Sequence, residues 1–464
     1  MTIPTKASLE GSETEEPDPR SGPSAPAAVG WVRPVATLVA IASLLVAVGV
    51  PILHLRAHLG GDEATYGREV AAVILGMVVF LMAGSVLVFR PETGSLKALV
   101  KTSAAWSVVI LLGLVATWWL IVVSDPLSGW FGEIILDDTD LQSFIAANVP
   151  EDTDLIQVPT GVFLQSLEFL SGDNVQVSGY YWQRFGPDIP DDFVRGVVFP
   201  EAIRDAYKQT EAYRYSEGDV ETVGWYFETT IREPFDYTYF PFDRQDVWIR
   251  LWSRDFTHNV VLVPDFPSYS DLDPLALPGL ERDFVYSGWT PRFSGFSMAF
   301  QPYSTSFGLG TAEEILLLPE LYFNLIVDRN FVGPFLEHFI FALAVAIMLF
   351  GLLVLTTDDE NLRSRFQLTT AGVLAACSGL IFAVILKHNQ LRALLGTRGV
   401  SYIEIIPILL YLAIAAVVIN AILLASPVKL RLIHHRNNLW PVLLYWPILL
   451  GSVLLATLYL FFVS

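Results

Sequence analysis

FDYTYFPFDRQDVWIRLW (residues 235–252) joins a rigid, polar corner to a stretch that alternates like a β-strand. Pro241 fixes one backbone dihedral and removes a hydrogen-bond donor, which suits a tight connection. Asp243 can accept backbone N–H bonds in such a turn and still present a negative charge. After the turn, apolar residues alternate with Asp246 and Arg250, as in a half-buried strand. Local physics alone therefore predicts a well-capped strand connection.

Two further stretches, residues 174–185 and 322–329, alternate in the same way, and turns rich in Gly, Pro and Asp separate such runs. We therefore expect residues 125–331 to form an antiparallel β-sandwich. This segment holds 34 of the 48 acidic residues and 12 of the 28 basic ones, which argues against nucleic acid as a partner. The single cysteine, Cys377, lies outside the segment, so no disulfide can form within it.

Seven runs of about 20 mostly apolar residues identify a multi-pass membrane protein embedded in a lipid bilayer. Three precede the sandwich and form a predicted packing or anchoring bundle at 31–124, while four follow it in a domain at 332–464. Residues 1–30 combine charge, Pro and Ser without apolar periodicity, which predicts a disordered tail. The runs are 32–55, 70–89, 104–123, 335–355, 366–386, 400–425 and 440–463.

The basic residues of the short loops predict the orientation, because Lys and Arg resist export. The loop with Arg90, Lys97 and Lys101 and the loop with Lys429 and Arg431 are expected to be cytoplasmic. The N-terminus is then cytoplasmic, and the sandwich and the C-terminus are extracytoplasmic, in the cell (inner) membrane. The basic loop after the fifth span does not follow this rule.

The chain lacks the common catalytic motifs. GxxxxGK[ST], HExxH, GxSxG and paired-cysteine metal spacing are all absent, and the adjacent His434 and His435 belong to a basic polar loop. The sequence therefore predicts no catalytic site, no metal site and no cofactor.

FDYTYFPFDRQ, followed by a strand, resembles the signature loop of the pentameric ligand-gated ion channels, the Cys-loop receptor superfamily. It resembles the prokaryotic type, which lacks the flanking cysteines. VSGYYWQRF (177–185), FPEA (199–202), LIVDRN (325–330) and the four closing spans come in the order of the superfamily. The resemblance covers about residues 150–464. The three leading spans are absent from the usual family plan, and the family's proline within the first channel helix is replaced by Pro334 at its start.

The resemblance implies a ligand-gated channel subunit that assembles with four further copies of itself, binds a small molecule or protons outside, and passes ions. In the family, the acidic residue of the loop and the arginine before the membrane meet and transmit binding to the pore. A plain structural ion pair is the alternative. The residues that this coupling role implies are Phe240, Pro241, Phe242, Asp243 and Arg329.

The resemblance implies that the helix 364–387 lines the pore, and one stripe of this helix carries both polar and bulky apolar side chains, as a pore lining requires. Leu374 is the expected gate. A buried helix whose small polar residues only pack against neighbours is the alternative. The acidic outer segment favours cations and Arg363 favours anions, and we expect cations. The stripe consists of Gln367, Ala371, Leu374, Ser378, Ile381 and Ile385.

Aromatic side chains suit a cationic or amphipathic ligand bound between neighbouring outer domains, although aromatics in strands often belong to the core. Polar residues near the outer membrane surface are candidates for pH sensing. The ligand candidates are Tyr181, Trp182, Trp252, Tyr303 and Phe307, and the pH candidates are Glu337, His338, His388 and Glu404. A non-conducting receptor that signals through the N-terminal spans and a membrane-bound enzyme remain alternatives.

Overall fold

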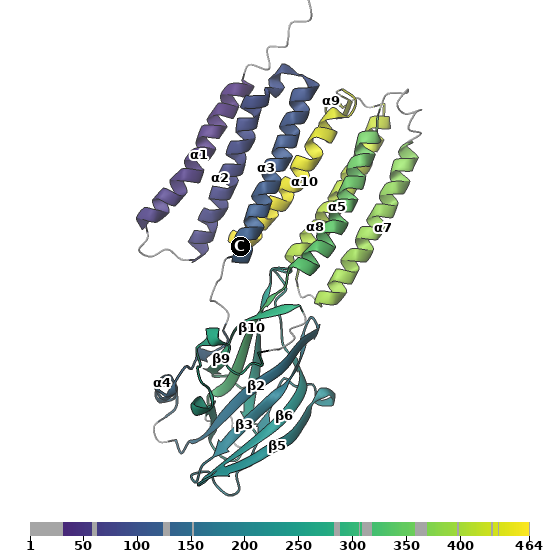
Figure 1. Ribbon diagram of the computed structural model, residues 1–464. Helices are drawn as coiled ribbons and strands as arrows, with labels where there is room; N and C mark the ends of the chain where they lie inside the picture. Colours follow the sequence, from purple (N-terminus) through teal and green to yellow (C-terminus); the bar gives the residue numbers. More distant parts are fainter. Residues whose placement is uncertain are drawn as a thin grey trace, which may run out of the picture. The chain divides into compact units, whose positions relative to one another are not determined.

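The computed structural model describes residues 31–57, 63–123, 130–150, 153–282, 288–305, 307–308, 318–357, 369–396, 399–427, 430–434 and 436–463. Among them, seven helices are long and apolar enough to cross a membrane, which supports a multi-pass membrane protein (Figure 1). All seven predicted spans coincide with these helices. The tail predicted at 1–30 lies outside the described residues. The helices are α1 (Val32–Ala57), α2 (Glu63–Phe89), α3 (Leu96–Val123), α4 (Asp138–Asn148), α5 (Val332–Leu355), α7 (Thr370–Leu395), α8 (Ile405–Ala425), α9 (Arg431–His434) and α10 (Leu439–Phe462).

The chain divides into two compact units, residues 1–110 and 111–464, and the division falls inside α3. In the first unit, α1 and α2 pack along small residues. Ala40, Ser43 and Ala47 on α1 are buried. A Cβ added at Gly76 on α2 would lie 3.0 Å from the carbonyl oxygen of Ser43. Small side chains let two membrane helices approach closely, which stabilises their association in lipid.

The sheet domain, residues 130–329, belongs to the second unit and contains two five-stranded sheets. Their strand orders are β1-β9-β10-β7-β4 and β5-β6-β3-β2-β8. The strands are β1 (Glu133–Ile134), β2 (Ile156–Ser171), β3 (Asn174–Phe185), β4 (Val197–Val198), β5 (Lys208–Glu217), β6 (Val220–Arg232), β7 (Arg244–Ser253), β8 (Val260–Pro264), β9 (Trp289–Ala299) and β10 (Glu320–Arg329).

One strand pair departs from the predicted antiparallel arrangement. β2 and β8 pair in parallel, with Ile156 opposite Val260, whereas the other described pairs are antiparallel. The physical reason is the connection between them. β8 reaches β2 after a long excursion of the chain rather than through a tight hairpin, so nothing forces the two directions to oppose.

Alternate residues of both sheets form one hydrophobic core. Val175 and Val177 on β3 and Val247 and Ile249 on β7 have no exposed surface. The strands predicted at 174–185, 246–252 and 322–329 are thus present as β3, β7 and β10, with their apolar faces inward.

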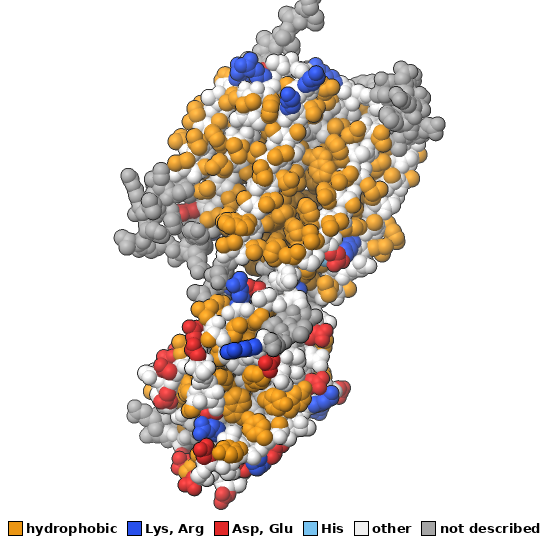
Figure 2. Space-filling view, viewed as in Figure 1, with side chains coloured by type: hydrophobic (Ala, Val, Ile, Leu, Met, Phe, Trp, Pro, Cys, Tyr) orange, Lys and Arg blue, Asp and Glu red, His pale blue; other side chains and the backbone are white. Residues whose placement is uncertain are grey.

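The C-terminal helices α5, α7, α8 and α10 share a second apolar core, to which Leu349, Val384 and Leu410 contribute. Outside this core their surface stays apolar, as lipid-facing helices require. Figure 2 shows hydrophobic side chains over the visible face of the helices and most of the Asp and Glu side chains on the sheet domain.

Candidate functional site

The proline loop (residues 235–243) connects β6 to β7 and is clamped by one glutamine. The Gln245 Nε2 donates to the Asp236 carbonyl at 2.7 Å, and the Gln245 Oε1 accepts from the Asp236 N–H at 3.2 Å. The peptide bond between Phe240 and Pro241 is cis. The two glutamine bonds therefore hold the start of the loop against the start of β7.

A buried ion pair attaches this loop to the last strand. The Arg329 Nε donates to Asp243 Oδ1 at 2.6 Å, and its Nη2 donates to Asp243 Oδ2 at 3.0 Å. The two side chains are only 15% and 1% exposed, respectively. The guanidinium also lies 4.1 Å from the Trp289 ring centroid and 4.7 Å from that of Phe240. Two parallel charge-assisted bonds and two aromatic faces hold the arginine in one orientation.

The other side of the proline loop is bonded to the segment that precedes α8. The Tyr402 N–H donates to the Thr238 carbonyl at 2.7 Å, and the Ile403 N–H donates to the Phe240 carbonyl at 3.2 Å. These backbone bonds join the sheet domain directly to the helices of the same unit. An apolar cluster surrounds them, formed by Tyr237, Phe240, Leu391, Leu395 and Ile403.

Phe242 extends the contact to the ends of three helices. Its ring centroid lies 5.3 Å from that of Phe331, which precedes α5, and 6.1 Å from those of Tyr402 and Phe461. Phe461 is in the last turn of α10 and also contacts Tyr239 at 5.0 Å. We call these contacts of residues 237–243 with the helices the junction.

The turn between β2 and β3 meets the end of α7. A Cβ added at Gly172 would lie 2.2 Å from the Leu395 carbonyl oxygen, so no side chain fits there. A cavity of about 230 Å³ lies beside this contact. Asp173, Phe235, Asp236, Tyr237, Thr238, Leu395, Gly396, Gly399, Val400 and Ser401 line it.

Glu404, a predicted pH-sensing residue, is the centre of a polar network that shapes the turn before α8. Its carboxylate is fully buried and accepts from Arg392 Nε at 2.6 Å and from the Ser401 N–H at 2.7 Å. The His388 ring connects Glu404 to Tyr411, with its Nε2 at 3.1 Å from Glu404 Oε1 and its Nδ1 at 3.2 Å from the Tyr411 hydroxyl. This network supports the backbone that bonds to the proline loop.

The other two pH candidates lie close by on α5. Glu337 forms an ion pair with Lys387 of α7. The His338 Nδ1 lies 2.8 Å from the Pro334 carbonyl oxygen, and the ring meets Phe240 edge-on with centroids 6.2 Å apart.

The predicted pore stripe forms one exposed face of α7. Ala371, Leu374, Ser378, Ile381 and Ile385 are all exposed, whereas Val373, Cys377, Leu380 and Val384 are buried against the other helices. Leu374 is 38% exposed. The helix begins at Thr370 and continues to Leu395, past the predicted end at 387. Gln367 lies outside the described residues.

Three of the predicted ligand residues meet in one aromatic cluster. The ring centroids of Trp252, Tyr303 and Phe307 lie 5.4 to 5.9 Å apart. Phe256, from the loop after β7, adds a fourth ring at 6.1 Å from Trp252. We call these four residues the aromatic cluster. Phe307 and Phe256 are 53% and 47% exposed, so the cluster offers two rings to solvent.

A carboxylate that is only 11% exposed organises the cluster from beneath. Glu320 Oε1 accepts from Trp252 Nε1 at 2.8 Å and from the Tyr303 hydroxyl, and Oε2 accepts from the Tyr322 hydroxyl at 2.9 Å. Arg250 lies beside it, with Nη1 at 3.1 Å from the Tyr303 hydroxyl.

Glu201 completes this polar set through its ion pair with Arg250. Burial raises the pKa of Glu201, and the bonds from Arg250 oppose this rise. Sequence reasoning missed Phe256, Glu320, Arg250 and Glu201 as site residues. The available signal was that Arg250 and Trp252 are two positions apart and therefore share the outer face of their strand.

Tyr181 and Trp182 have other surroundings. Tyr181 has no exposed surface and stacks on Trp225 at 4.9 Å within the core. Trp182 donates from Nε1 to Asp265 Oδ2 at 2.8 Å and stacks on Tyr269. Among the described residues, no ring contact joins either side chain to the aromatic cluster.

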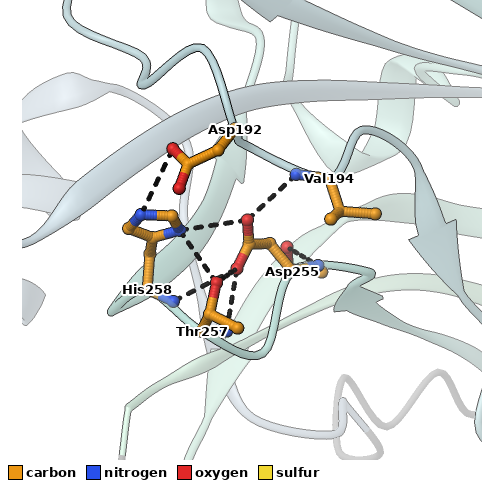
Figure 3. Close-up of polar contacts among 6 residues, drawn as sticks. Asp192, Val194, Asp255, Thr257 and His258 are labelled. Atoms are coloured by element: carbon orange, nitrogen blue, oxygen red, sulfur yellow. Dashed lines mark hydrogen bonds and ion pairs between the residues drawn. The ribbon is translucent and has the colours of Figure 1, made fainter.

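The loop that presents Phe256 is pinned by Asp255 (Figure 3). Its Oδ1 accepts from the N–H of Thr257 at 2.8 Å and of His258 at 3.1 Å, while its Oδ2 accepts from the Val194 N–H at 2.9 Å. Burial alone would raise the pKa of Asp255, but these hydrogen bonds outweigh it and hold the pKa below its ordinary value.

The contact between Trp118 and Tyr402 was not predicted from the sequence. Trp118 lies in the part of α3 that belongs to the second unit, and its Nε1 donates to the Tyr402 hydroxyl at 2.7 Å. Its ring meets those of Phe335 and Phe339 at 4.8 and 5.9 Å. The Tyr402 hydroxyl also lies 2.9 Å from Thr457 Oγ1 of α10. A leading span therefore contacts the same residue that bonds to the proline loop.

No protein-family model matches the chain, and no curated protein matches it.

Proposed function

We propose that the chain is the subunit of a homopentameric ligand-gated ion channel of the Cys-loop receptor type. In this proposal the sheet domain is an extracytoplasmic β-sandwich, and α5, α7, α8 and α10 form the pore domain. The observation that carries it is the junction. Asp243 and Arg329 hold the proline loop to the sheet, and backbone bonds from Tyr402 and Ile403 hold it to the helices. A displacement of the sheet domain would therefore reach the helices through one stiff element.

The face of α7 that carries Leu374 supports the pore assignment. Its residues are exposed in the single subunit, and they include Ala371 and Ser378 as well as large apolar side chains. Five such faces around one axis would enclose a narrow path, and a ring of Leu374 side chains would close it by excluding water.

The aromatic cluster supports a cationic or amphipathic ligand that binds where neighbouring subunits meet. Exposed rings attract a cation through their faces, and the carboxylate of Glu320 adds negative charge beneath them. The outer segment, with 34 acidic and 12 basic residues, carries the whole of the chain's negative balance and would concentrate permeant cations near the pore.

Reconstitution tests this proposal. The purified chain is expected to form five-fold particles and to conduct in planar bilayers. Leu374→Ser is expected to raise the unliganded open probability by about tenfold, because a polar ring no longer excludes water. Ala371→Ser, one turn away on the same face, is the matched control and should change it little. A monomeric particle, or equal effects of the two substitutions, would refute the pore assignment.

A non-conducting receptor is the second candidate. The hydrogen bond from Trp118 to Tyr402 favours it, because it gives the leading spans a direct contact with the junction. The absence of current from pentameric particles that bind ligand would select this candidate.

A further inference from the structure

A short segment of chain crosses the outer face of the sheet that contains β7. This strap, residues 130–132, leads into β1, and hydrogen bonds and ring stacking hold Phe131, its central residue. The Phe131 N–H donates to Asp246 Oδ2 at 3.0 Å, and its carbonyl accepts from Asn324 Nδ2 at 3.0 Å. The Phe131 ring stacks on Trp248 with centroids 5.4 Å apart. The strap is therefore an integral part of this face.

A cavity of about 420 Å³ lies between the strap, the end of β6 and the start of β7. The carboxyl groups of Glu233 and Asp246 form its walls together with Asp236 and several aromatic rings, and residues of the proline loop contribute to them. The lining comprises Trp130, Phe131, Glu233, Pro234, Phe235, Asp236, Arg244, Gln245, Asp246, Trp248 and Ile326.

Each of the two carboxyl groups keeps one oxygen without a hydrogen bond. Glu233 is 2% exposed, and its Oε2 accepts from the Trp248 N–H at 3.3 Å. Asp246 accepts from the strap through Oδ2 alone. Within the described part of the chain, Glu233 Oε1 and Asp246 Oδ1 are buried and have no partner. A buried carboxyl oxygen without a partner is costly, and an occupant that donates to both would remove that cost.

We propose that this cavity binds a small primary ammonium ion, whose N–H groups donate to Glu233 and Asp246 while its alkyl part packs on the rings of Trp130, Trp248 and Phe235. The rings offer faces to a positive charge. Calcium or magnesium fits the site less well, since such ions take six or more oxygens and the described residues contain no cluster of three metal-ligating side chains.

The charged surroundings of the two carboxyls support this occupant. Arg244 of β7, which lines the cavity, and Arg292 of β9 both pair with Asp328 of β10, and Asp236 of the proline loop adds a further carboxylate. Glu201, which is paired with Arg250, lies near enough to Glu233 to act on it as a negative charge. The occupant would therefore meet net negative charge.

Protons compete for the same oxygens when the cavity is empty. Burial raises the pKa of Asp246 to about 7 and raises the pKa of Glu233 well above its usual range. An ammonium ion that binds the carboxylate forms must then displace protons, so its affinity rises with pH.

The site is placed to act on the junction. Gln245, which lines the cavity, donates to Asp243 Oδ2 at 2.9 Å and clamps Asp236. An occupant would thus touch the elements that hold the Asp243–Arg329 pair. Binding of the ammonium ion to this cavity does not require that the chain conducts ions.

Isothermal titration of butylammonium chloride into the full chain in detergent tests the site, with 1-butanol as the neutral match. We expect saturable binding of the ammonium ion alone, at least tenfold tighter at pH 8 than at pH 6, because the proton of Asp246 alone gives about tenfold and displacement of the Glu233 proton adds to it. Glu233→Gln and Asp246→Asn should each weaken it at least tenfold. Asp188→Asn, an exposed carboxylate elsewhere in the domain, should leave it unchanged.

Several results would overturn the proposal. These are equal binding of 1-butanol, an equal effect of Asp188→Asn, or binding of calcium in place of butylammonium. Loss of binding in Glu320→Gln but not in Glu233→Gln would assign the ion to the aromatic cluster instead and leave the proposed channel function intact. If melting curves show that the carboxyl variants do not fold, the unmodified chain still tests the proposal. Titrations in two buffers of different ionisation enthalpy then measure the proton release that the proposal requires.

Discussion

In the proposed channel, removing either partner of the Asp243–Arg329 pair should change opening far more than a similar change one residue away. Asp243→Asn keeps the shape of the side chain but leaves a guanidinium that is only 15% exposed without a counter-charge. Breaking such a buried pair costs about 3–5 kcal/mol. Because two charge-assisted bonds at 2.6 and 3.0 Å disappear together, we expect a coupling free energy of about 2 kcal/mol between the two positions.

The assay is a double-mutant cycle with Asp243→Asn, Arg329→Gln and the double variant. Its readout is the ligand concentration for half-maximal current, where 2 kcal/mol corresponds to about 30-fold. Melting temperature is followed in parallel, because a purely structural pair would couple in unfolding and not in opening. Arg329→Lys should behave almost like Arg329→Gln, since an ammonium cannot make both bonds.

The neighbouring pair Arg244–Asp328 supplies the matched control. It joins the same two strands at 2.7 Å, but its side chains are 21% and 23% exposed. Its coupling in channel opening should be below about 1 kcal/mol. Additive effects of Asp243→Asn and Arg329→Gln on opening, or equal coupling in both pairs, would refute the role of the buried pair.

Three further outcomes are expected. Trp118→Phe removes the donor to Tyr402 and should accelerate hydrogen exchange at the Tyr402 amide about fivefold, as the loss of about 1 kcal/mol implies. Burial raises the pKa of Asp246 from 3.8 to about 7. The protonated side chain therefore makes its full contribution to the free energy of unfolding below about pH 4, and this contribution is lost as the pH rises through 7. Asp246→Asn should therefore raise the melting temperature at pH 8, with a difference that shrinks toward pH 4. Gly172→Ala should cost about 2 kcal/mol or more in the free energy of unfolding, because its Cβ would lie 2.2 Å from the Leu395 carbonyl oxygen.

The tryptophan and glycine changes each have a neutral counterpart. Trp119 is 63% exposed, so Trp119→Phe should leave exchange at Tyr402 unchanged. A Cβ at Gly186 would meet no atom within 4 Å, so Gly186→Ala should be tolerated. Exchange that responds equally to both tryptophan changes, a pH-independent effect of Asp246→Asn, or equal costs at the two glycines would contradict the respective argument.

Local periodicity was sufficient for most of the secondary structure. Apolar runs long enough to span a membrane predicted all seven long helices, and strict alternation predicted β3, β7 and β10. α4 was missed, although its start is readable from the sequence. Asp137 caps it by accepting from the Asp140 N–H at 2.9 Å.

The sites depended on packing to a much greater degree. Tyr181 and Trp252 both alternate on strands as aromatic residues, yet Tyr181 lies in the core and Trp252 joins the aromatic cluster. Glu320 shows no sign of its role in the sequence, because its three partners come from different strands and loops.

The amino-acid sequence by itself determined where the chain crosses the membrane and where it forms strands, because side-chain period and hydrophobic length act over neighbouring residues. Only the tertiary structure decided which distant groups meet. The register of β7 against β10 brings Arg329 onto Asp243, and the strap covers Glu233 and Asp246. Such contacts depend on how whole sheets pack, and no short stretch of sequence contains that information.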